Sequence, residues 1–147
     1  MNGITLRKAT IDDMELTFNW RNAPENYKCF ISREGVDKHT HIEWFNKILN
    51  DDKRYLLIAE IDRKPVGVLR YDIINDDSAE ISIHLKPGIT GKGIGTEIIV
   101  TGSTWLKHYA PYIKNVIANI IPTNIPSQKA FAKAGFLIHH LCLMKSI

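Results

Sequence analysis

The stretch HLKPGITGKGIGTEIIVTGSTWL, residues 84–106, joins an alternating apolar segment to a long segment with helical periodicity. Three glycines, Gly91, Gly93 and Gly95, lie where the two patterns meet. Successive backbone N–H groups in a glycine-rich turn that opens a helix converge on one point, and the helix dipole adds partial positive charge there. The stretch therefore predicts a binding site for a phosphate or pyrophosphate group, to which Lys92 adds a full positive charge.

The spacing of these glycines excludes two common phosphate-binding loops. A P-loop requires a glycine five residues before its Gly-Lys-Ser/Thr, but that position is Lys86 here and Lys92 is followed by Gly93. A dinucleotide-binding loop requires a third glycine three residues after the second, and Thr96 stands there instead. The phosphate therefore belongs to another class of ligand.

The rest of the chain alternates between helical and extended patterns. Helices are predicted over residues 11–22, 37–51, 95–109 and 123–136, and strands over 4–8, 54–61, 65–74, 79–85, 115–121 and 136–144. Short polar connections between three consecutive strands imply an antiparallel meander. The order β α α β β β α β α β predicts an α/β (α+β) fold, a mixed sheet between helices, in a single domain over residues 1–147.

Composition and charge exclude several classes of partner. The 19 basic and 16 acidic residues give a net charge of +3 and are spread along the chain, without the basic stripe of a nucleic-acid-binding protein. The sequence has neither a signal peptide nor a membrane span, so we expect a cytoplasmic location. Cys29 and Cys142 lack metal-site spacing and are expected in the core; His39 and His41 lie on different helix faces. We therefore expect no metal.

Two separated motifs carry a family resemblance. The segment AEISIHLKPGITGKGIGT supplies Glu80, Pro87, Gly93 and Gly95, and the later helix supplies Asn124, Ser127, Gly135 and Phe136. This pattern resembles the GNAT superfamily of acyl-CoA-dependent N-acetyltransferases. That family has a coenzyme A loop of the form Arg/Gln-x-x-Gly-x-Gly/Ala, followed by an Asn-x-x-Ser helix that ends in Gly-Phe.

The resemblance implies a mostly antiparallel sheet whose central strands splay at residues 81–85, with acetyl-CoA as cofactor. Backbone groups in the splayed strand would bind the pantetheine arm, and the amides of residues 91–96 would bind the pyrophosphate. The implied coenzyme-binding residues are Ile83, Leu85, Thr90, Gly91, Lys92, Gly93, Ile94, Gly95, Thr96, Asn124, Ser127 and Phe131.

Two positions depart from the family pattern. Thr90 occupies the Arg/Gln position of the loop, and Phe131 occupies the position of the frequent tyrosine acid. A phenylalanine cannot protonate a leaving group. Because a thiol with a pKa near ~8.5 can leave as thiolate, the loss slows transfer by about 10²–10⁴-fold and does not exclude it.

Proton removal from the amine requires a base. Glu80, Ser82 and His84 share the polar face of their strand, and this places their side chains in the implied slot. We expect Glu80 to be the catalytic base and take His84 as the second candidate. The alternative, a polar face that is only solvated, stays open.

The segments FNWRNAPE and HTHIEWF are similar to those of bacterial GNAT members that acetylate nucleotide-linked amino sugars, closest to the UDP-amino-sugar N-acetyltransferases of the pseudaminic acid pathway. The resemblance implies that the substrate is a small-molecule amine on a nucleotide sugar. An aromatic plane beside an arginine suits a uracil ring and its diphosphate. The residues assigned to acceptor binding are Trp20, Arg21, Asn22, His41, Trp44 and Arg70.

Alternatives to this assignment remain. Trp20 and Trp44 also fit helix core positions, and GNAT members that modify ribosomal-protein N-termini or aminoglycosides carry similar tryptophan–arginine pairs. A catalytically silent acyl-CoA-binding module is the alternative from another class, since Thr90 and Phe131 both depart from the pattern. The apolar final strand is a candidate edge for pairing in a homodimer.

Overall fold

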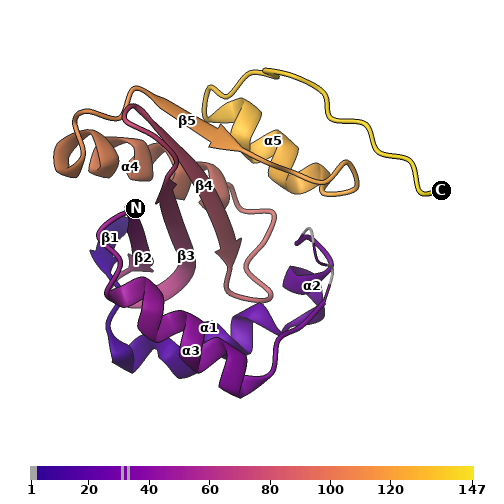
Figure 1. Ribbon diagram of the computed structural model, residues 1–147. Coiled ribbons are helices and arrows are strands. Elements are labelled where there is room, and N and C mark those ends of the chain that lie inside the picture. Colours follow the sequence, from indigo (N-terminus) through magenta and orange to yellow (C-terminus); the bar gives the residue numbers. More distant parts are fainter. Residues whose placement is uncertain (1–2, 31, 33) are drawn as a thin grey trace.

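The computed structural model describes residues 3–30, 32 and 34–147, and in this part of the chain a five-stranded sheet forms the centre of the fold (Figure 1). The strands are β1 (Thr5–Lys8), β2 (Arg54–Ile61), β3 (Lys64–Ile73), β4 (Ser78–Leu85) and β5 (Asn115–Ala118). They lie in the order β1–β2–β3–β4–β5; only the β4–β5 pair is parallel. The predicted meander and the mixed, mostly antiparallel sheet are confirmed.

Helices cover both faces of the sheet (Figure 1). They are η1, a 3₁₀ helix (Ile11–Asp13), followed by α1 (Met14–Arg21), α2 (Pro24–Tyr27), α3 (Lys38–Leu49), α4 (Ile94–Tyr109) and α5 (Ile125–Lys133). One core cluster joins α1 and α3 to the sheet, and a second cluster lies under α4 and α5. None of the helices in the described ranges is both long and apolar enough to cross a membrane.

Strand alternation explains the two cores. Leu57 and Leu69 belong to the cluster under α4, whereas Leu56 and Val68, one residue away on each strand, belong to the cluster under α1 and α3. Arg70, two residues beyond Val68, therefore lies on the α1–α3 face. Polar side chains at this end of the strands leave part of that face available for a ligand.

The strands β4 and β5 separate within the sheet. Their last paired residues are Ile81 and Ala118, but β4 continues to Leu85. Figure 1 shows β4 and β5 diverging beyond this point. The predicted splay of the central strands is therefore confirmed, and its cause is that β5 ends four residues into its pairing with β4.

Two local predictions differ from the structure. The predicted final strand over residues 136–144 is wrong: no strand forms there, and the side chains of Leu137, Leu143 and Met144 are 91–93% exposed. An alternating pattern becomes a strand only where a neighbouring edge supplies hydrogen bonds, and this segment runs past α5 away from the sheet (Figure 1). The helix α2 was not predicted, because Pro24 reads as the end of the preceding helix, whereas it opens a new turn.

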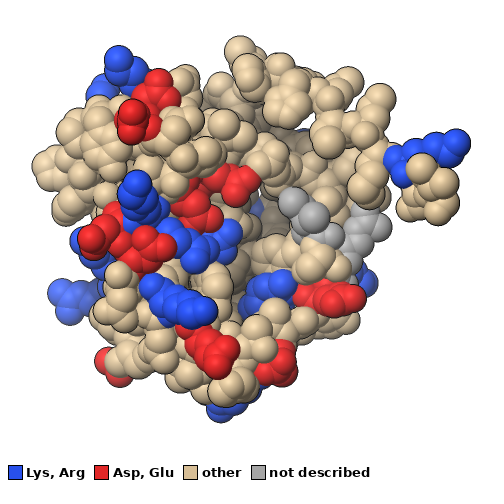
Figure 2. Space-filling model, viewed as in Figure 1, with Lys and Arg blue, Asp and Glu red and all other residues tan. Residues whose placement is uncertain are grey.

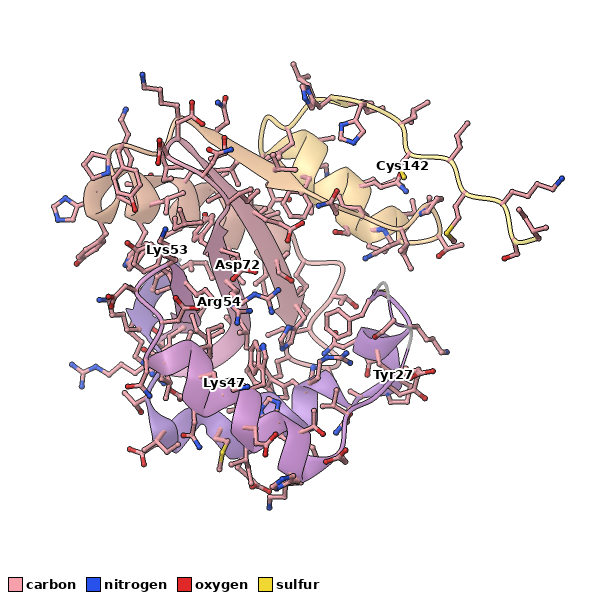
Figure 3. The ribbon with its side chains drawn as sticks, in the orientation of Figure 1. Tyr27, Lys47, Lys53, Arg54, Asp72 and Cys142 are labelled. Carbon is pink, nitrogen blue, oxygen red and sulfur yellow. The ribbon has the colours of Figure 1, made fainter. Side chains whose placement is uncertain are left out.

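The prediction that both cysteines lie in the core is also wrong. Cys29 is only half-buried, and Cys142 is exposed in the C-terminal segment, where Figure 3 labels it. The apolar neighbours of Cys142 suggested a buried strand. Since that strand does not form, burial of the thiol does not follow.

Close packing of α4 on the sheet requires a glycine. A Cβ atom at Gly102 would lie 2.5 Å from Leu69 Cδ2 and 2.6 Å from Tyr71 Oη, both on fully buried side chains. The same atom at Gly95, also in α4, would make only ordinary contacts, at 3.8 Å or more.

We expect Gly102→Ala to be less stable than Gly95→Ala by about 1–3 kcal/mol, the usual cost of overpacking a core. Both variants replace a glycine of α4 by alanine, and the larger helix-propensity gain expected at the interior position Gly102 acts against the steric cost. Urea unfolding of the two variants measures it. Equal midpoints and slopes would contradict the close packing of α4 on β3.

Candidate functional site

The gap between β4 and β5 opens into a cleft of about 1020 Å³. Figure 2 shows this hollow near the middle of the face, with charged side chains along its left rim. Most of the predicted site residues line it: Arg21, His41, Trp44, Arg70, Glu80, Ile83, His84, Leu85, Thr90, Gly91, Gly93, Ile94, Gly95, Thr96, Asn124, Ser127 and Phe131. The cleft reaches from the glycine loop to α3, so coenzyme and acceptor residues share one space.

Backbone groups of β4 are open along the coenzyme side. Lys86 N donates to Val66 O at 2.8 Å, which directs that residue toward β3. By alternation, Ile83 and Leu85 direct their N–H and C=O groups away from β3, toward the space that β5 leaves. Asn26 Nδ2 already donates to Leu85 O at 3.0 Å, so Ile83 offers the free edge to an extended amide chain such as pantetheine.

The glycine loop opens directly into α4. Gly91 and Gly93 have φ values of +86° and +74°, in the left-handed region that residues with a Cβ avoid. Gly93 is the N-cap of α4 and supplies no side chain to its first amides. These amides therefore remain free for an anion, and the loop fits a pyrophosphate.

Basic side chains near the loop differ from the prediction. Lys92 does not line the cleft, whereas Lys129 and Lys133 of α5 do. Their spacing of four residues places both on one face of α5, and this spacing was visible in the sequence. Lys129 and Lys133 are therefore the cations available to a phosphorylated ligand on this side.

The start of α5 explains part of the family motif. Asn124 Oδ1 accepts a hydrogen bond from Ser127 N at 3.3 Å, so the Asn-x-x-Ser segment caps the helix. Phe131 is 4% exposed and packs edge-to-face on Phe136, with ring centroids 4.9 Å apart. No acid stands at this position, and the ring forms an apolar part of the cleft.

An arginine cluster lies on the acceptor side of the cleft. Asp72 Oδ1 accepts from Arg54 Nε at 2.9 Å, and Asp72 Oδ2 accepts from Arg70 Nε at 3.2 Å. The two guanidinium carbons lie 5.8 and 5.7 Å from the ring centre of Trp44. Figure 3 shows Arg54 and Asp72 beside one another on the sheet, next to α3. One carboxylate therefore serves two guanidinium groups.

Arg21 adds a third guanidinium to this side. Its Nη1 donates to Glu34 O at 2.7 Å, and its guanidinium carbon lies 4.0 Å from the ring centre of Phe30. No carboxylate pairs with Arg21 among residues 3–30, 32 and 34–147. Burial and the charge of Arg70 lower the pKa of Arg21 below its ordinary value. The acceptor side thus holds one guanidinium group, that of Arg21, without a carboxylate in direct contact.

His41 lies between α1 and α3. Its Nε2 is 3.1 Å from Thr17 Oγ1, and the Thr17 hydroxyl donates to Met14 O at 3.0 Å. The hydroxyl proton is therefore used, and the contact assigns a proton to His41 Nε2. Burial lowers the pKa of His41. A hydrogen bond with the backbone of Met14 opposes this shift, and the charge of Arg21 adds to it. The imidazole is therefore kept neutral.

Two residues assigned to acceptor binding lie away from the cleft. Trp20 is 7% exposed and packs in the core under α1 and α3. Asn22 accepts from Val36 N at 2.7 Å and donates to Val36 O at 2.8 Å, so its amide joins the end of α1 to the following loop. The core alternative describes Trp20, and the role of Asn22 is local.

The two candidate bases both line the cleft, at different distances along β4. Glu80 lies in the paired part of β4, and its carboxylate accepts from the side-chain amide of Asn119, just beyond β5. His84 lies in the unpaired part, with its ring edge-to-face on Phe30 at 5.7 Å. Three residues were not predicted, because only the tertiary fold brings them together: Asn119 and Phe30, which line the cleft, and Asp72, which binds Arg70.

In the described part of the chain, no group of three His, Cys, Asp or Glu side chains is placed to hold a metal ion.

Comparisons with known proteins agree with this geometry. Residues 4–137 match the Acetyltransferase (GNAT) domain family. An uncharacterized protein of Methanocaldococcus jannaschii is 32% identical over 136 residues, or 90% of this chain, and the match spans 28% of that protein's length. Acetyltransferase PseH of Campylobacter jejuni is 27% identical over 144 residues, covering 91% of this chain and 87% of PseH.

A solved structure shows the same fold. AAC(6')-Ib in complex with ribostamycin and coenzyme A gives a TM-score of 0.83 at 20% identity, covering 92% of this chain and 84% of that chain. Since the family match extends over most of the sequence, this chain belongs to the GNAT acetyltransferase family and is an N-acetyltransferase domain.

Proposed function

We propose that this domain acetylates the amine of a nucleotide-linked amino sugar, of the UDP-4-amino-dideoxysugar type. The observation that carries the proposal is the charge on the acceptor side, where Arg21 and Arg70 line the cleft. Arg70 shares the carboxylate of Asp72 with Arg54, and Arg21 has no carboxylate partner among the described residues. Both arginines bound to Asp72 use Nε, so their terminal nitrogens remain for a ligand. A diphosphate would supply the negative charge that this cluster lacks.

The aromatic side chain beside the cluster supports a nucleotide further. Trp44 is half-buried, and its ring borders the cleft beside Arg70. A planar base can stack on the part of the indole that stays accessible, while the arginines bind the phosphates. This arrangement combines an aromatic plane with a guanidinium pair within one acceptor site.

Cationic acceptors fit this side of the cleft less well. Aminoglycosides and polyamines carry several positive charges, which Arg21 and Arg70 would repel. The carboxylates that line the cleft are Glu25 and Glu80, and each already accepts a hydrogen bond, from Gly88 N and from Asn119. The likeness to an aminoglycoside acetyltransferase is therefore a likeness of fold.

The chain's own groups support the reaction in a defined way. The amine nitrogen forms a bond to the acetyl carbonyl carbon, and the carbon–sulfur bond breaks to release a thiolate. Backbone N–H groups along the open edge of β4, such as that of Ile83, are donors available to the developing oxyanion. No side-chain acid at Phe131 is needed if the thiolate leaves unprotonated.

An acceptor panel tests the proposal directly. With acetyl-CoA as donor, thiol release is followed in the presence of UDP-4-amino-dideoxysugars, a peptide amine, spermine and an aminoglycoside. We expect the highest kcat/KM with the UDP-sugars. Higher kcat/KM with peptides or polycations would replace the proposal with those acceptors, and absence of transfer to every acceptor would refute it.

We expect Arg70→Gln to raise the KM for the nucleotide sugar about 10–100-fold, because a hydrogen bond to a charged group is worth ~1.5–3 kcal/mol. Asp72 keeps its partner Arg54, so the fold should persist. Lys107→Gln, an exposed charge change on α4, is the matched control and should leave the KM unchanged. An equal effect of the two variants would remove the arginine cluster from the acceptor site.

The glycine loop gives a separate prediction for the coenzyme. Gly93→Ala should weaken acetyl-CoA binding about 5–30-fold, since a left-handed residue with a Cβ costs ~1–2 kcal/mol and shifts the amides. Gly88→Ala carries the same strain, at φ +85°, but lies outside the cleft and should not change the dissociation constant. Calorimetric titration of both variants with acetyl-CoA measures the two dissociation constants. If Gly93→Ala and Gly88→Ala weakened binding equally, the loop assignment would be contradicted.

A further inference from the structure

A buried polar atom in the cleft has no partner. His84 Nε2 is buried and makes no hydrogen bond to any residue within 3–30, 32 and 34–147. His84 is one of the residues that line the cleft, and its ring lies edge-to-face with that of Phe30, which also lines it. An unpaired buried nitrogen costs about 1–3 kcal/mol, so its presence calls for an explanation. Packing alone does not supply one, because an apolar side chain would fill the position at lower cost.

The location of His84 links the two halves of the cleft. It lies three residues past Ile81, the last residue of β4 that pairs with β5, where the open strand edge begins. Ser82, two residues before it on the same face, pairs across the sheet with Arg70 of the acceptor side. His84 therefore stands where the open strand meets the arginine cluster.

The other candidate base is placed differently. Glu80 lies in the paired part of β4, and Asn119 already donates to its carboxylate. That hydrogen bond occupies one acceptor site of the carboxylate and holds the side chain beside Asn119, next to the end of β5. His84 Nε2 makes no hydrogen bond within the described residues, and in the Nδ1–H tautomer it presents a free lone pair.

We propose that His84 is the catalytic base and accepts the proton of the acceptor amine at Nε2. As the amine nitrogen bonds to the acetyl carbon, the carbon–sulfur bond breaks and the electron pair leaves with the thiolate. The proton lost by nitrogen passes to Nε2 and then to solvent, which restores the neutral imidazole. The products are the amide, the thiolate and one released proton.

The charges around His84 make its pKa depend on whether an acceptor is bound. Burial first, and then Arg21, Arg70 and His41, lower the pKa of His84 to about 3, so the imidazole is neutral but weakly basic in the free protein. Other charged groups near its face of the cleft are Glu80 on β4 and Glu25 on α2. An anionic group bound between the two arginines would offset their charge and raise this pKa toward 6.5. This rise in the pKa of His84 rests on the proposed anionic acceptor.

The test compares His84→Gln with Glu80→Gln, using whichever acceptor of the panel gives the highest turnover. We expect His84→Gln to lower kcat about 10²–10⁴-fold with an unchanged dissociation constant for acetyl-CoA, and Glu80→Gln to lower it much less. In the wild type, kcat should fall as the pH drops through the raised pKa, because imidazolium cannot accept a proton. That acidic limb should be absent from the His84→Gln profile.

Titration by ¹⁵N NMR of histidine-labelled protein supplies a readout that packing changes would not mimic. The His84 signal, assigned by its loss in His84→Gln, should stay neutral down to about pH 4 in the free protein. Added UDP should raise its pKa by at least about one unit. An unmoved pKa would refute the coupling to an anionic acceptor while leaving the base assignment to the kinetics.

The assignment of His84 is overturned if His84→Gln keeps kcat within about threefold of wild type, or keeps the acidic limb. If the Gln variant does not fold, as judged by circular dichroism, His84→Asn carries the same comparison. Because the kinetic test uses the best acceptor of the panel, it stands even if that acceptor is not a nucleotide sugar. Failure of the proposed function and failure of the proposed base are thus separate results.

Discussion

The separation of β4 from β5 after Ile81 and Ala118 is the constraint on which the site depends. A strand edge inside a protein must find hydrogen-bond partners, and buried backbone groups without them are costly. Here Asn26 Nδ2 donates a hydrogen bond to Leu85 O, while the outward backbone groups of Ile83 remain available to a ligand. Because the chain passes from β4 through the glycine loop into α4, the same divergence also brings the helix N-terminus to that edge.

Charge on the acceptor side follows from the sheet register. Cross-strand pairing places Asp72 between Arg54 and Glu80, so one carboxylate holds the arginines of two strands while Glu80 bonds to Asn119. Burial lowers the pKa values of His41 and His84, and the guanidinium of Arg21 lowers both further. Burial is the main reason that both imidazoles stay neutral, and the guanidinium charge that adds to it also favours an anionic ligand.

Sequence patterns predict the elements of this fold better than its site. Strand alternation and helix periodicity depend on local spacing, so β2, β3, β4 and α3 appear within a residue or two of their predicted ends. The contacts of Asp72 and Asn119 depend on register between strands, which no local pattern encodes. Periodicity also cannot separate a core tryptophan such as Trp20 from one at the cleft, since both lie on the inner side of their helices.

The departure from the family pattern at Phe131 is consistent with a reaction in which the protein assists only one proton transfer, that from the amine. Phe131 packs on Phe136 in an apolar part of the cleft, where a phenol would need a partner for its hydroxyl. A thiolate with a conjugate-acid pKa near ~8.5 leaves without protonation close to neutral pH. The demanding proton transfer is then removal from the amine, and both candidate bases, Glu80 and His84, lie on β4. The histidine there, His84, has an unpaired Nε2, and Arg70 pairs across the sheet with Ser82, two residues away.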